Sequence, residues 1–312
     1  MPPEGGNLAA DDPAREALRR LRWPLVHHLG VHAAGDERSR YRGPGIEYAD
    51  VREYQPSEDA RLIDWNLTAR SDRPFVRESD QERGLDAWLI IDSSCSLNWG
   101  TTRALKWTAA MELVELLTLL LARHGGRVGG IVFDTRLRRI LALTGGRRGR
   151  LKLISRIAAE PPTPGDGGRT DLASVLRHAG RVIRRPSLVI VISDFLVEPG
   201  WQQPLKALAL RHDVVAARVF DPREVDIPAI GVVTFQDAET GRQIEVDTGN
   251  RKFRQRYHDA ALKQRQRLTA DLRRARAQLL EVETAEPVIG QLIRFLQSRQ
   301  RLRGGRALKR VG

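Results

Sequence analysis

The chain has 312 residues, of which 41% are hydrophobic and 29% are charged, as is typical of a soluble globular protein. The single cysteine, Cys95, excludes an internal disulfide and fits a reducing compartment. No apolar run approaches the roughly 20 residues that a membrane span requires, and residues 1–20 lack the apolar core of a signal peptide. We therefore expect a cytoplasmic protein without stable membrane insertion.

The net charge of +13 is concentrated at the carboxyl-terminal end. Residues 251–312 carry seventeen Lys and Arg against five Asp and Glu, a net charge of +12, which leaves the rest of the chain nearly neutral. A basic region attracts nucleic acid, anionic lipid or acidic proteins. Aromatic residues are too sparse among the basic residues here for a surface that stacks single strands, so we favour solvated helix faces over nucleic-acid binding.

Residues 1–83 are interpreted as a small N-terminal extension. A helix is expected over residues 13–28, because apolar residues recur there at helical spacing. A Gly- and Arg-rich loop over 33–45 follows. An unusual polar block over 45–70 and a strand over 75–82 then lead into the main domain.

From residue 86 onwards, short apolar strands alternate with amphipathic helices. The expected strands cover residues 86–92, 127–133, 137–143, 187–194, 213–220 and 279–283. The expected helices cover residues 102–124, 149–159, 171–184, 201–211, 250–277 and 286–300. This alternation predicts an α/β fold with a mostly parallel sheet and helices on both faces. We expect one domain over 84–303, with a polar β-hairpin insertion over 231–247 and a basic tail over 304–312.

Two of the expected strands end in aspartate, and ligands in such folds bind beyond the carboxyl ends of the strands. The first runs into the sequence DSSCS, where an extended backbone would turn Asp92, Ser94 and Ser96 to one side. The second ends at Asp194, and Thr170 follows a Gly-rich loop at the start of a helix. Oxygen ligands from three loops suit a hard cation, so we expect one divalent ion, Mg²⁺, with Mn²⁺ or Ca²⁺ as alternatives. The competing interpretation is a set of polar turns in which these side chains cap helices.

In this order and context, DSSCS, GGRTDL and VISDF resemble the metal-ion-dependent adhesion site of von Willebrand factor A domains. The pattern of that family is Asp-x-Ser-x-Ser, a later Thr and a later Asp, and all five positions are filled here. The resemblance implies that Ser94, Ser96 and Thr170 touch the metal directly, whereas Asp92 and Asp194 hold it largely through water. It also implies an open sixth position for a carboxylate from a partner protein.

The polar block before the domain carries a second resemblance. Its sequence, GIEYADVREYQPSEDARLIDWNLTAR, is similar to a segment of the bacterial family called domain of unknown function number fifty-eight, whose members join it to a von Willebrand A-like domain. The matching positions are Arg52, Glu53, Tyr54, Pro56, Asp59, Arg61, Ile63, Asp64, Trp65, Ala69 and Arg70. Ser57 and Glu58 replace the usual Gly and Asp of the turn.

Two interpretations of this block stay open. Its charged residues form either a structural ion-pair network around two aromatic side chains or a docking face for a partner. The candidate partner-binding residues are Arg52, Glu53, Tyr54, Asp59, Arg61, Asp64, Trp65 and Arg70.

The family resemblance implies a non-enzymatic, metal-dependent adaptor that binds other proteins. Members are usually encoded beside MoxR-type AAA+ ATPases, so the expected partners are such an ATPase and a client protein. The implied process is chaperone-like maturation or assembly of a complex such as an oxidoreductase. Two alternatives stay open: an Mg²⁺-dependent hydrolase, although no second-metal cluster or general base is evident, and a nucleic-acid-binding protein that uses the basic carboxyl-terminal region.

Overall fold

The chain divides into two compact units, Leu85–Gly312 and Val31–Gly84. In the larger unit the computed structural model describes residues 85–122, 125–163, 170–236 and 243–308. In the smaller unit it describes residues 51–54, 63, 65–69 and 73–77.

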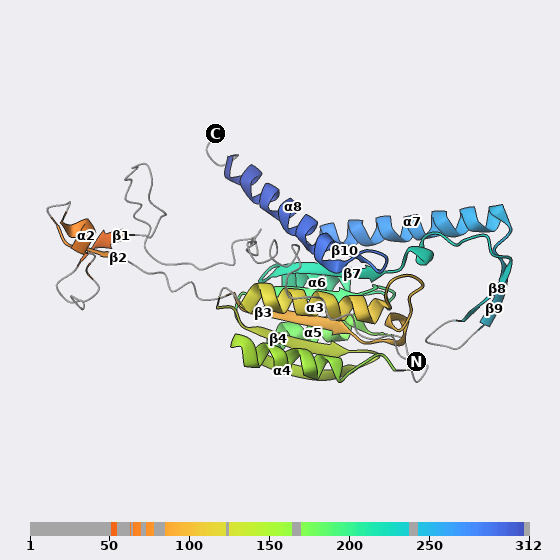
Figure 1. Ribbon diagram of the computed structural model, residues 1–312, viewed down its shortest axis with the longest axis horizontal. Helices are drawn as coiled ribbons and strands as arrows, with labels where there is room; N and C mark the ends of the chain where they lie inside the picture. Colours follow the sequence, from red (N-terminus) through yellow and green to blue (C-terminus); the bar gives the residue numbers. More distant parts are fainter. Residues whose placement is uncertain are drawn as a thin grey trace. The chain divides into compact units, whose positions relative to one another are not determined.

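The larger unit is built on one six-stranded sheet (Figure 1). Its strands are β3 (Ala87–Asp92), β4 (Val128–Phe133), β5 (Leu137–Thr144), β6 (Leu188–Ser193), β7 (Asp213–Phe220) and β10 (Gln278–Glu283). They lie in the order β10-β7-β6-β3-β4-β5, and neighbouring strands are parallel except for the β4–β5 hairpin. The central strands β3, β4 and β6 are buried along their whole length, as their largely apolar sequences require. The predicted α/β class with a mostly parallel sheet and helices on both faces is therefore confirmed.

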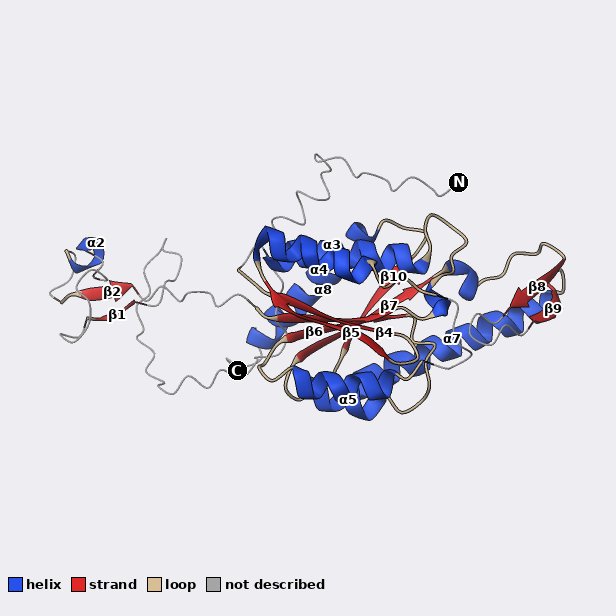
Figure 2. Cartoon of the chain, turned by 90° about the horizontal axis from the view of Figure 1, so that it is seen from below, coloured by secondary structure: helices blue, strands red, loops and turns tan. Residues whose placement is uncertain are grey.

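Helices cover both faces of this sheet (Figure 2). One face carries α3 (Lys106–Ala122), α4 (Gly146–Ala158) and α8 (Val288–Leu308). The other face carries α5 (Leu172–Val182), α6 (Gln202–Ala209) and α7 (Arg251–Arg274). Because successive side chains of a strand point to opposite faces, Ile91 of β3 packs in the first core and Ile90 in the second.

Side-chain caps determine where two of these helices begin. The Asp171 carboxylate accepts a hydrogen bond from the Ser174 amide at 2.9 Å, so α5 begins at Leu172. The Asn250 side chain accepts hydrogen bonds from the amides of Lys252 and Phe253, so α7 begins at Arg251.

An antiparallel hairpin lies between β7 and α7 in the sequence, as predicted for residues 231–247. It consists of β8 (Val232–Gln236) and β9 (Gln243–Asp247). The helix that follows it, α7, buries Leu268 and Leu272 near its carboxyl-terminal end. That end therefore anchors α7 to the core.

The antiparallel strand β5 forms one free edge of the sheet. Arg138 of this strand donates a hydrogen bond to the Asp134 carboxylate at 2.5 Å. Its neighbour Arg139 donates one to the Glu160 carboxylate at 2.5 Å. Ion pairs therefore hold two arginines along this edge.

The smaller unit contains a short antiparallel pair of strands and one helical turn. β1 (Val51–Glu53) pairs with β2 (Phe75–Arg77), and α2 (Trp65–Thr68) lies between them in the sequence. The Thr68 hydroxyl accepts a hydrogen bond from the Phe75 amide at 3.1 Å, which ties α2 to β2. Of the strand predicted over 75–82, residues 75–77 are described and are extended.

Most predicted boundaries agree with the structure to within about three residues, and two differ by more. The helix predicted from residue 102 begins at Lys106, because Thr101 is held by the Asp221 carboxylate through its amide and its hydroxyl, at 2.8 and 2.6 Å. Helix α8 continues to Leu308, so residues 304–308 of the predicted basic tail are helical. The helix predicted over 13–28 lies outside the described residues. In the described part of the chain, no helix combines the length and apolar character of a membrane span.

Candidate metal site

The predicted site lies where β3 and β6 end side by side. These strands are parallel neighbours, so their carboxyl ends meet at one edge of the sheet. The Ser193 hydroxyl at the end of β6 donates a hydrogen bond to Asp92 Oδ2 at 2.6 Å. The same Ser193 Oγ accepts a hydrogen bond from the Phe195 amide at 3.0 Å. Ser193 therefore connects Asp92 to the loop that contains Asp194.

The DSSCS segment groups its polar side chains, although not in the way that we predicted. The extended backbone stops at Ser94, and Cys95–Leu97 form a single 3-10 turn, η2, that buries Leu97. Within this turn the hydroxyls of Ser94 and Ser96 lie 3.1 Å apart. The Ser94 amide donates to Asp92 Oδ1 at 2.9 Å. We predicted this grouping from the alternation of side chains along an extended backbone. That reason was wrong, because the 3-10 turn brings Ser96 back to Ser94.

Thr170 and Asp194 occupy the two neighbouring loops. The cap of α5 is Asp171, so the Thr170 side chain does not have the helix-capping role of the competing interpretation. Thr170 is buried, and its carbonyl accepts a hydrogen bond from the Glu198 amide at 3.1 Å. Glu198 follows Asp194 in the same loop. This bond therefore holds Thr170 to the loop that contains Asp194.

Burial makes Asp92 a weak acid. Asp92 is 0% exposed, and its burial, followed by the negative charge of Asp194, raises its pKa from 3.8 to about 7. The described neighbours that contact its oxygens are Ser94 and Ser193, both uncharged donors. A buried carboxylate without a cationic partner, beside a second carboxylate and two clustered hydroxyls, is a donor set that fits a hard divalent cation. The residues present therefore fit the predicted ion.

Sequence reasoning missed one charged residue of the site, Lys106. This first residue of α3 is 1% exposed, and its ammonium group donates to Asp194 Oδ2 at 2.8 Å and to Glu224 Oε1 at 2.6 Å. Glu224 belongs to the 3-10 turn η3 (Pro222–Glu224) after β7. Burial alone would lower the pKa of Lys106, but the two carboxylates raise it above its ordinary value. A lysine at the start of an amphipathic helix gave no sequence signal for this role.

Two apolar side chains stand exposed on the loops of the site. Trp99, shortly after η2, is 38% exposed, and its ring centroid lies 5.8 Å from the Lys106 ammonium. Leu196 is 44% exposed, and its amide donates to Asp194 Oδ1 at 3.0 Å. The acidic site is therefore flanked by apolar surface. Cys95 is half-buried.

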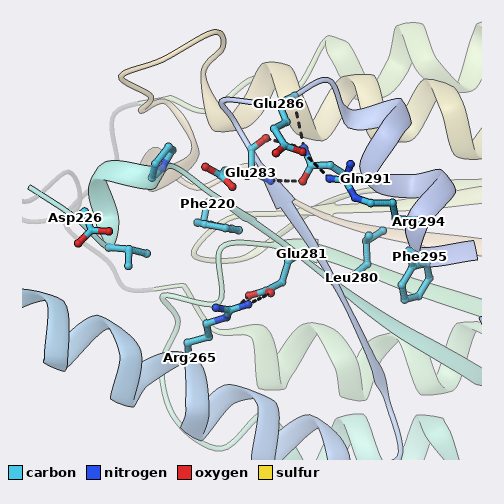
Figure 3. Close-up of a pocket in the computed structure, with 12 residues that line it drawn as sticks. Phe220, Asp226, Arg265, Leu280, Glu281, Glu283, Glu286, Gln291, Arg294 and Phe295 are labelled. Carbon is cyan, nitrogen blue, oxygen red and sulfur yellow. Dashed lines mark hydrogen bonds and ion pairs between the residues drawn. The ribbon is translucent and has the colours of Figure 1, made fainter. Parts of the chain in front are cut away.

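A separate pocket of about 470 Å³ lies at the carboxyl ends of β7 and β10 (Figure 3). Arg265 pairs with Glu281, and Arg294 pairs with Glu286 at 2.6 Å, across its lining. The Gln291 side chain bonds the backbone of β10. These contacts already satisfy many of the polar side chains that line the pocket. The pocket is therefore a weaker candidate for a ligand site than the carboxylates of Asp92 and Asp194.

The N-terminal signature is described only in part. Trp65 is 67% exposed, which makes it available to a partner. Tyr54 is half-buried, and its amide donates to the Pro74 carbonyl at 2.8 Å. The side chains of the other candidate partner-binding residues lie outside the described part, namely those of Arg52, Glu53, Asp59, Arg61, Asp64 and Arg70. Their role in binding stays a prediction.

A family model described as "Protein of unknown function DUF58" matches residues 50–267. The chain belongs to the DUF58 family. Two relatives are the uncharacterized protein Rv1480 of Mycobacterium tuberculosis and Mb1516 of Mycobacterium bovis. Each is 36% identical over 295 residues, which cover 93% of this chain and 92% of the relative.

Solved structures resemble this DUF58 protein more distantly. The conserved hypothetical protein BatB of Bacteroides thetaiotaomicron is 17% identical, with a TM-score of 0.47, over 70% of this chain and 100% of that one. A von Willebrand factor type A structure from Catenulispora acidiphila is 14% identical, with a TM-score of 0.31, over 43% of this chain and 32% of that one. Similarity at this level carries no functional argument.

Proposed function

We propose that this DUF58 protein is a non-enzymatic adaptor whose metal site binds other proteins. Asp92, Ser94, Ser96, Thr170 and Asp194 would hold one divalent cation, with Mg²⁺ as the expected ion. When bound, the ion supplies a Lewis-acidic position for a carboxylate of a partner protein. The observation that carries the proposal is Asp92, a fully buried carboxylate that makes no ion pair with a described Lys, Arg or His.

The surroundings of the site support binding rather than hydrolysis. The Asp194 carboxylate is already bonded to Lys106 and to a backbone amide, so it is poorly placed to activate water as a base. Among the described residues, no three His, Cys, Asp or Glu side chains form a cluster that could hold a metal, so a two-metal hydrolytic centre has no support, and the proposed ion would depend on Ser and Thr hydroxyls as well as carboxylates. Exposed Trp99 and Leu196 give a partner apolar surface beside the ion.

The proposed partners are a MoxR-type AAA+ ATPase and a client protein. The adaptor would present the client to the ATPase during chaperone-like maturation or assembly of a complex such as an oxidoreductase. Membership of the DUF58 family and the resemblance stated for its signature segment support this part of the proposal.

The test is a pull-down from native lysate with wild-type and Asp92→Ala protein, each in Mg²⁺ and in EDTA, read by mass spectrometry. The proposal expects an ATPase or client that only the wild type retains, and only with Mg²⁺. Cys95→Ala is the matched control in the same loop and should behave as wild type. Equal capture in all conditions would show that the ion does not mediate binding.

A further inference from the structure

Lys106 has an unusual environment for a lysine. It lies at the first turn of α3, almost fully buried, with carboxylates of two different loops on its ammonium group. Lysine is rarely buried to this degree unless it is paired, because the desolvation of its charge is costly. The two contacts, at 2.8 and 2.6 Å, provide that pairing. The pairing uses Asp194, which is also one of the proposed metal-binding residues.

Several charges act on the Asp194 carboxylate. The ammonium group of Lys106 lies 2.8 Å from it, and the negative charge of Glu224 and the positive charge of Arg218 act on the same group. A divalent cation held by Asp194 would therefore share that carboxylate with the positive charge of Lys106.

We propose that Lys106 is the resident counter-cation of the metal site and that, together with Glu224, it tunes the affinity of the site for cations. In this role Lys106 does not touch the ion. It neutralises one carboxylate of the cluster and holds Asp194 in place when no ion is bound. This inference rests on the proposed metal site and adds to it two residues outside the adhesion-site pattern.

The inference makes a prediction that a purely structural ion pair does not make. Removing Lys106 increases the negative charge around the ion, so the affinity for cations rises, and it rises more for a trivalent ion than for a divalent one. Even at the dielectric constant of water, a unit charge within several ångströms of a divalent ion changes its affinity by about tenfold. Removing Glu224 has the opposite sign. A side chain that only supports the fold would weaken binding when removed.

The experiment removes the charges of Lys106 and Glu224, singly and together, in the full-length protein. The affinities for Mg²⁺ and La³⁺ are measured by calorimetry. Lys106→Met should bind Mg²⁺ at least about tenfold more tightly and should shift the preference further towards La³⁺. Glu224→Gln should bind Mg²⁺ about tenfold more weakly. The double variant removes one charge of each sign, so its net charge equals that of the wild type, and it should return close to the wild-type affinity. Lys206→Met, which removes an exposed lysine of α6, is the matched control and should leave both affinities unchanged.

The outcomes separate this inference from the proposed function. If the wild type binds Mg²⁺ but Lys106→Met binds it equally or more weakly, Lys106 is a structural residue and the inference fails alone. If Lys106→Met does not fold, Glu224→Gln still decides, because unchanged Mg²⁺ affinity in that variant contradicts the charge argument. If neither the wild type nor Lys106→Met binds Mg²⁺ or La³⁺, the metal site and the role of Lys106 fall together.

Discussion

Replacing Asp92 by Asn should stabilise the protein in the absence of metal. The pKa of Asp92 in the folded chain is about 7, against 3.8 ordinarily, so the folded state binds the proton more tightly than the unfolded state. The contribution of this group therefore becomes increasingly unfavourable as the pH rises from 3.8 to about 7. At pH 8 the difference amounts to at most about 4 kcal/mol, and Asn, which has no charge, avoids it.

The assay is urea unfolding at pH 8, in EDTA and in Mg²⁺. In EDTA, Asp92→Asn should have the higher free energy of unfolding. In Mg²⁺ at about 100 times its dissociation constant, the wild type should gain about 2.7 kcal/mol and the variant should gain little. Asp259→Asn, an exposed position on α7, should change the free energy by no more than about 0.5 kcal/mol.

A result in which Asp92→Asn is less stable than the wild type in EDTA would refute this reasoning. It would mean that the negative charge of Asp92 is already compensated within the chain. The argument that this residue needs an external cation would then fail together with the stability prediction.

Three further perturbations test the described structure. His212 is 2% exposed, and burial, followed by the charge of Arg211, lowers its pKa from 6.5 to about 4. As the pH falls, the unfolded chain therefore binds a proton at His212 before the folded chain does, which lowers the stability of the fold. His212→Leu should remove about 2 kcal/mol of the stability that the wild type loses between pH 8 and pH 5, measured by urea unfolding. Arg299→Met leaves the fully buried Asp213 without its ion-pair partner and should cost about 3–5 kcal/mol in the same assay, whereas Arg299→Met with Asp213→Asn should recover part of that loss. Asp171→Ala removes the cap of α5 and should lower the free energy of unfolding by about 1 kcal/mol, while Mg²⁺ affinity measured by calorimetry stays unchanged.

The parts of the fold that sequence could predict are those governed by local patterns. The apolar runs that form β3 and β6 are buried on both faces, so they are recognisable as central strands, and their final residues necessarily meet at one sheet edge. That logic alone is enough to place Asp92 and Asp194 near each other. Ser96 joins them for a different reason, because the 3-10 turn of η2 depends on burying Leu97.

Lys106 could not be predicted, because its contacts are not local. Its two carboxylate partners lie 88 and 118 residues further along the chain, and one of them follows a different strand. Sequence periodicity assigns a residue to a face of its own helix, but it does not show what packs against that face. The same limit applies to Asp221, which binds Thr101 from 120 residues away and so delays the start of α3.

The charged edge of β5 affects how copies of this protein can add to one another. An unpaired strand edge invites another copy to add its own strand, and the addition then repeats from copy to copy. Here a second strand would have to dehydrate the ion pairs of Arg138 and Arg139 before its backbone could bond to β5. The ion pairs along β5 thus discourage the open-ended addition of strands from further copies of this protein.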